Sequence, residues 1–159
     1  MAWTDIVALV LIAGVAWVES QRGFGRSLFD VVGAIISLKV ADLVSQMLME
    51  AAPVLSTPNG SQAFWYSAVF LVLIALTILA TKIIYDTVLL SLDVLDPLAG
   101  ALIGLISGLI VAHVFLKTLH LGSVGDDLTV LLSTFMGQEL LQFRTYHAIV
   151  TALQNLGSW

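Results

Sequence analysis

The chain has 159 residues, of which 59% are hydrophobic and only 11% charged, and its mean hydropathy is +1.02. Soluble domains carry about 25% charged residues, so this composition indicates an integral membrane protein. A net charge of −5, with only six Lys and Arg, leaves no basic surface for a phosphate backbone and argues against nucleic acid as a partner. Cysteine is absent, which excludes disulfides and thiolate chemistry.

The first apolar stretch predicts a transmembrane helix over Ala2–Glu19, with Trp3 at interface depth and Asp5 in an acidic first turn. No positive charge precedes it and no clear cleavage site follows, so we expect it to stay as an anchor. The polar break after it predicts a short basic turn on the cytoplasmic side, formed by Arg22, Gly23, Phe24 and Arg26.

A second helix is predicted to start after Ser27, because Ser27 and Asp30 have capping-box spacing, and to continue to about Glu50. Lys39 and Asp42 lie in one polar sector of this helix. The helix therefore either spans the membrane with that sector facing the bundle, which is our expectation, or lies partly in the interface. At a spacing of three residues, Lys39 and Asp42 also suit a simple ion pair.

Residues 51–63 contain two prolines, an asparagine and a glycine and predict a loop. A third transmembrane helix is expected over Phe64–Tyr85, opening on an aromatic belt, with Lys82 reaching the interface. Residues 86–96 then predict an acidic amphipathic connector.

Pro97–Leu119 predicts a fourth transmembrane helix, since at about 1.5 Å per residue it reaches about 34 Å, enough for a hydrocarbon core of about 30 Å. Asp96 is expected to cap this helix. Small residues four positions apart form a ridge along it that allows another backbone to approach closely. We expect this ridge to pack against a helix of this chain or of another subunit; its members are Gly100, Gly104, Gly108 and Ala112.

His113, Lys117 and His120 form a stripe roughly opposite this ridge. A buried imidazole such as His113 can ligate a metal, haem or a chlorophyll-type pigment. Near a helix end, however, such a stripe also reaches lipid phosphates, and we take this as the expectation, with no metal and no cofactor.

Residues 128–156 have apolar side chains at helical spacing but no apolar stretch long enough to span, which predicts amphipathic helices on the membrane surface or on the bundle. The prediction is therefore an all-α, polytopic protein with a transmembrane domain of four helices over residues 1–121 and an amphipathic segment over residues 122–159. The positive-inside rule places the basic turn in the cytoplasm and both termini outside.

The motif RGFGR, Arg22–Arg26, and the stretch LDPLAGALIGLISG, Leu95–Gly108, resemble the bacterial colicin V production protein (CvpA) family. Asp5, Gly33 and Asp96 also occupy positions of the family's pattern, whereas Pro97 and Ser107 stand where basic residues are common. The resemblance covers roughly residues 3–120. It implies a four-helix inner-membrane protein linked to colicin V production and envelope upkeep, and it brings no catalytic residues.

No motif for nucleophilic, metal or phosphate chemistry is present, so we expect a non-enzymatic scaffold or accessory subunit. Its expected partners are the lipid bilayer and other membrane subunits or copies of itself, assembled through the glycine ridge. One alternative is a small transporter or channel component with Lys39 and Asp42 lining a path. Another is a haem- or pigment-associated subunit that uses His113 and His120.

Overall fold

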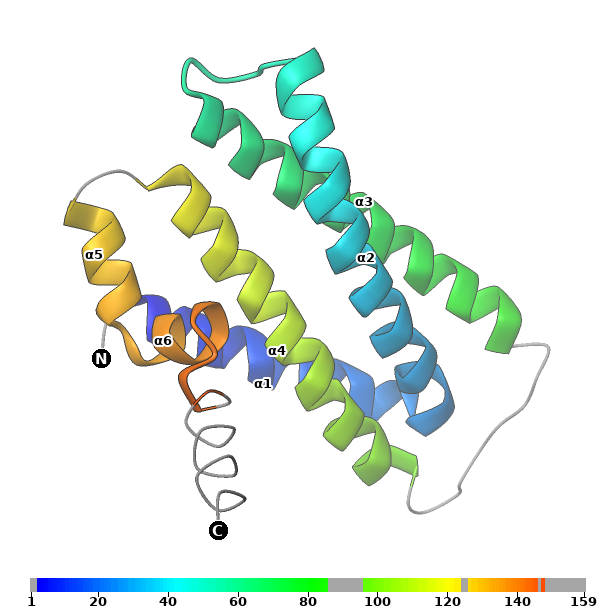
Figure 1. Ribbon diagram of the computed structural model, residues 1–159. Helices are drawn as coiled ribbons and strands as arrows, with labels where there is room; N and C mark the ends of the chain where they lie inside the picture. Colours follow the sequence, from blue (N-terminus) through cyan, green and yellow to red (C-terminus); the bar gives the residue numbers. More distant parts are fainter. Residues whose placement is uncertain (1–2, 86–95, 124–125, 146, 148–159) are drawn as a thin grey trace, which may run out of the picture.

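The computed structural model describes residues 3–85, 96–123, 126–145 and 147, and all the regular structure in these ranges is helical (Figure 1). Three helices are long and apolar enough to cross a membrane, namely α1, α3 and α4. The predicted class, an all-α membrane protein, is therefore confirmed. The helices are α1 (Trp3–Arg22), α2 (Phe24–Ala51), α3 (Pro58–Tyr85), α4 (Asp96–Gly122), α5 (Asp126–Ser133) and α6 (Phe135–Leu141).

The four long helices form two antiparallel pairs, α1 with α4 and α2 with α3, and α2 also lies beside α4 (Figure 1). The start of α1 meets the end of α4, where the rings of Trp3 and Phe115 lie 6.3 Å apart edge to face. The end of α1 meets the start of α4, where Glu19 lies against Gly100. One apolar cluster joins α2, α3 and α4 through Ala41, Tyr66, Phe70 and Val114.

The break between α1 and α2 is a single residue, Gly23, so the turn is shorter than the predicted one from Arg22 to Arg26. Gly23 has φ +81°, a left-handed conformation that favours glycine, and a β-carbon there would overlap the Asp96 carboxylate. The capping-box interpretation is wrong, because Ser27 lies inside α2. The third helix begins earlier than predicted, at Pro58. The predicted connector over residues 86–95 and the C-terminal residues 148–159 lie outside the described ranges.

The glycine ridge of α4 packs against α1 of the same chain. A β-carbon at Gly104 would lie 2.8 Å from the Cα of Ala16, and one at Gly108 would lie 2.8 Å from the Cα of Ile12. Ala112, the last member of the ridge, is fully buried beside Ala8. At Gly104 and Gly108, the backbones of α1 and α4 therefore lie closer together than any residue larger than glycine allows.

The short helices α5 and α6 pack on the end of the bundle where α1 begins and α4 ends. Leu131 and Met136 join a buried cluster with Ala8 and Leu116. The Met136 amide, in the first turn of α6, donates a hydrogen bond of 2.9 Å to Asp5 Oδ1, and Asp5 is only 2% exposed. Asp5 therefore stabilises the N-terminus of α6 rather than only that of its own helix.

We expect Gly104→Ala to lower the melting temperature of the detergent-solubilised protein, because its methyl group would displace the α1 backbone. Overpacking of this kind costs about 1–3 kcal/mol of unfolding free energy. Gly14→Ala is the matched control, since a β-carbon at Gly14 meets no atom within 4 Å. Equal melting temperatures for the two variants would contradict the packing described here.

Candidate functional site

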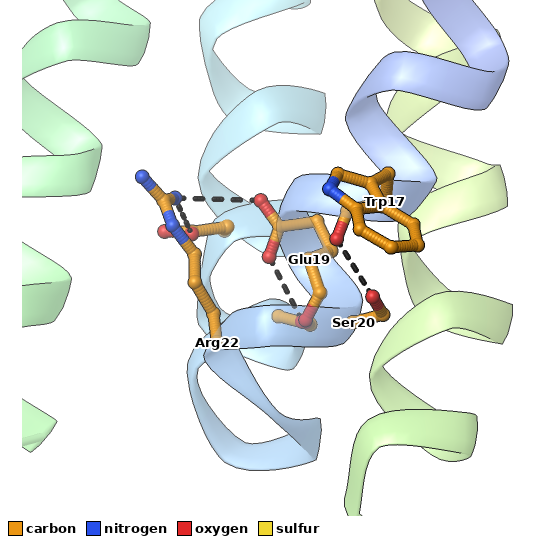
Figure 2. A network of polar contacts seen from close by, with 6 residues as sticks. Trp17, Glu19, Ser20 and Arg22 are labelled. Carbon is orange, nitrogen blue, oxygen red and sulfur yellow. Dashed lines mark hydrogen bonds and ion pairs between the residues drawn. The ribbon is translucent and has the colours of Figure 1, made fainter.

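A cluster of buried ionic side chains lies where α1 meets α2 (Figure 2). Arg22 Nη1 lies 2.8 Å from Asp30 Oδ2 and 3.4 Å from Glu19 Oε1. The Ser27 hydroxyl donates to Glu19 Oε2 at 2.8 Å. Glu19 and Asp30 are 5% and 4% exposed, so two buried carboxyl groups share one guanidinium. Such a cluster is stable only while the cation stays in place.

The turn that builds this cluster is held by α4. The amide of Phe24, at the start of α2, donates a hydrogen bond of 2.7 Å to Asp96 Oδ1. Asp96 was predicted to cap its own helix; the structure shows that it caps α2. Gly23 redirects the chain after α1. The Arg22 guanidinium points toward Glu19, whereas Trp17 and Ser20 lie on the side away from Arg22 (Figure 2). Arg22 is therefore engaged within the protein and is not a free charge of a cytoplasmic loop.

An apolar groove of about 380 Å³ begins at this cluster and runs between α1 and α3, with α2 and α4 as its floor. Two buried oxygens beside it, Asp30 Oδ1 and Ser107 Oγ, have no hydrogen-bond partner among the described residues. Unpaired buried oxygens are costly, so they mark a place where a hydrogen-bond partner is missing. The apolar residues that line the groove are Val10, Leu11, Val15, Val18, Ala34, Ile74, Ile78 and Val111, with Gly14 beside them.

A second cavity, of about 610 Å³, lies between α2, α4 and the residues around α6. It brings together two groups that the sequence suggested separately, the polar sector of α2 and the stripe of α4. These residues are Lys39, Asp42, His113, Lys117 and His120. The other lining residues are Leu38, Leu132, Leu141, Gln142 and Phe143.

Within this cavity, Asp42 pairs with Lys117 of α4 rather than with Lys39, so the predicted ion pair within α2 is wrong. Lys117 also lies over the ring of Tyr66, 4.8 Å from its centroid. Lys39 is exposed and forms no ion pair with any other residue in the described ranges. The helical period of α2 places Lys39 and Asp42 on one face. It does not show that Lys117 of α4 lies opposite that face.

His113 Nδ1 lies 2.7 Å from the carbonyl oxygen of Leu140. A carbonyl only accepts, so Nδ1 carries the hydrogen and Nε2 remains the nitrogen that can accept or ligate. In the part of the chain that is described, no group of three His, Asp or Glu side chains is arranged to hold a metal ion. The expectation of no cofactor and the alternative of a pigment at His113 both stay predictions.

Glu19, Asp30 and Ser107 were not among the candidate site residues derived from the sequence. The predicted first helix ends at Glu19, because the polar residues after it resemble a loop. The available signal was the three-residue spacing of Glu19 and Arg22, which places both on one face once α1 is extended to Arg22. No local pattern indicated that Asp30 or Ser107 would line the same groove.

Apolar helices that bury shared ion pairs and small-residue contacts define a multi-pass helical membrane protein. The family described as Colicin V production protein matches residues 4–138, and the chain belongs to this family. The match continues beyond residue 120, through α5 and into α6, which the sequence resemblance did not cover. Comparisons with curated proteins and with solved structures found no match.

We expect Arg22→Met to lower the unfolding free energy by about 3 kcal/mol, because it leaves Glu19 and Asp30 buried without a cation. Lys82→Met, at an exposed cation of α3, should change it by less than about 0.5 kcal/mol. The double variant Arg22→Met/Glu19→Gln should recover part of the loss, since one carboxylate is then neutral. Chemical unfolding in detergent measures all three. Additive losses in the double variant would show that the three groups do not act as a unit.

Proposed function

We propose that the chain is a non-enzymatic scaffold or accessory subunit of the bacterial inner membrane that binds a transmembrane helix of a partner in the groove between α1 and α3. The description of its family supports a link to colicin V production, and the resemblance noted in the sequence implies a role in envelope upkeep. The observation that supports the proposal is the pair of buried oxygens beside the groove, Asp30 Oδ1 and Ser107 Oγ, which lack a hydrogen-bond partner among the described residues.

The glycine ridge does not supply the surface for a partner, because α1 covers it. The outer wall of the groove is not covered in this way. A β-carbon at Gly14 meets nothing within 4 Å, and Val10 and Val18 are 65% and 46% exposed. Small residues on such a face allow close approach of a second helix.

A partner helix can supply hydrogen bonds to the unpaired oxygens of the groove, and a lipid tail cannot. A hydrocarbon tail cannot donate to Asp30 or Ser107, whereas a Ser, Asn, Lys or Arg side chain on a helix can. A cationic side chain would also pair with the carboxyl groups that share Arg22 in this cluster. We therefore assign the groove to a helix that carries a polar or basic residue among apolar ones, from another protein or from a second copy of this chain.

We further propose that α2 is a fourth span. Helices α1, α3 and α4 are long and apolar enough to cross a membrane, and α1 and α4 run antiparallel. If only these three crossed, α1 and α4 would run in the same direction. Their opposite directions favour an even number of crossings, and we propose that α2 provides the fourth. Its charged sector faces the protein in part, where Lys117 meets Asp42.

The topology can be tested with single cysteines, since the chain has none of its own. Cysteines at Asn59 and Asp127 should react in intact cells with a membrane-impermeant thiol reagent, and one at Gln21 should react only after the membrane is permeabilised. If α2 does not span, Asn59 and Gln21 will react under the same condition. Labelling of Gln21 alone in intact cells would invert the orientation and place both termini in the cytoplasm.

The scaffold role predicts a stoichiometric partner that is lost when the groove is filled. Gly14→Leu places an isobutyl group at the groove, where a β-carbon meets no atom within 4 Å. It should reduce recovery of that partner at least about tenfold, the effect of losing roughly 1.4 kcal/mol. Ala75→Leu is the control, because Ala75 is exposed on α3 and does not line the groove. The measurement is affinity purification in mild detergent with mass determination of the complex. Equal recovery with both variants would contradict the assignment of the groove.

A further inference from the structure

We propose that the cavity between α2, α4 and α6 binds the phosphate group of an anionic membrane lipid. This inference concerns the opposite end of the bundle from the groove and does not depend on the scaffold role. It rests on the charged groups and the lining of the cavity that contains Lys39 and Lys117, and on the exposed apolar residues of α2 beside Lys39.

The cavity carries surplus positive charge. It contains two ammonium groups, Lys39 and Lys117, against one carboxylate, Asp42, even when His113 and His120 are taken as neutral. Lys117 is paired with Asp42, which leaves Lys39 as the cation without an ion pair in the described structure. His120 adds further hydrogen-bonding capacity, because its Nδ1 is buried and has no partner among the described residues. An anion is therefore the ligand that this set of side chains suits.

The surroundings of Lys39 indicate that the anion comes from the lipid. Along the face of α2 that carries Lys39, Ile36, Val40 and Leu43 are 58%, 36% and 65% exposed, as expected of side chains that meet acyl chains. A charged side chain on such a face is costly unless it is neutralised or reaches the interface. A lipid phosphate beside Lys39 does both, because the acyl chains of the same molecule can lie along the exposed face.

The remaining wall of the cavity suits an amphiphile. Leu132, Leu141 and Phe143 line it on the side of α5 and α6, so the cavity is apolar on one side and cationic on the other. This wall is fixed by two hydrogen bonds, from the Met136 amide to Asp5 and from His113 Nδ1 to the Leu140 carbonyl. The volume, about 610 Å³, lies within the range of about 300–1,000 Å³ typical of small-ligand sites.

The test uses the full chain in nanodiscs of phosphatidylcholine alone or with added phosphatidylglycerol. Native mass spectrometry after release into detergent should show retained phosphatidylglycerol on the wild type. Lys39→Gln should weaken that retention about tenfold, the effect expected for one charge-assisted hydrogen bond. Lys82→Gln, which removes an exposed cation at the other end of the bundle, should retain the lipid as the wild type does. The Lys39 variant should fold normally, because Lys39 forms no ion pair with another described residue.

Three results would overturn the proposal. Equal retention by the wild type and Lys39→Gln would show that the cavity does not hold the headgroup. Stabilisation by inorganic phosphate in phosphatidylcholine nanodiscs, equal to that given by phosphatidylglycerol, would show that the anion is free phosphate and not lipid. A visible absorbance band of the purified protein that is lost in His113→Leu would show that a pigment or haem occupies the cavity instead.

Discussion

The close approach of α1 to α4 determines how the rest of the bundle is arranged. Hydrophobic burial does not drive helices together in lipid, because acyl chains solvate apolar side chains as well as another helix does. Dispersion across a short distance must hold the pair, and Gly100, Gly104 and Gly108 provide that distance. Because α1 lies against α4, α3 packs mainly on α2. The groove between α1 and α3 is the space that remains.

The same contact explains the position of the buried ions. Gly100 lies against the Glu19 carbonyl, which brings the end of α1 to the start of α4 and places Asp96 within hydrogen-bonding distance of the Phe24 amide. That hydrogen bond fixes the start of α2, and Asp30 is thereby presented to Arg22. A small-residue ridge and an ionic cluster, which look unrelated in the sequence, are thus parts of one arrangement.

Features that depend on one helix were predictable, whereas features that depend on which residues meet across helices were not. Length and hydropathy located the apolar helices, and four-residue spacing located the ridge. The Ser27–Asp30 spacing resembles a cap, but both side chains are engaged by α1 instead. Likewise, Lys39 is the nearer cation to Asp42 along the chain, yet Lys117 is its partner. Spacing along one helix shows which residues share a face. It does not show which residues of other helices that face contacts.

The two cavities differ in whether acidic or basic groups are in excess, and this difference limits what each can bind. At the turn between α1 and α2, two carboxylates share one guanidinium; between α2 and α4, two ammonium groups share one carboxylate. Isolated charges of either sign are unfavourable in a membrane, so each surplus favours a neutralising group from outside the chain. The acidic groups in excess lie among buried atoms between helices, and we propose that a positioned side chain of a partner reaches them. The positive surplus lies beside lipid-facing residues of α2, where a mobile headgroup can. The proposed partner site and the proposed lipid site therefore lie at opposite ends of one bundle, where burial and charge differ.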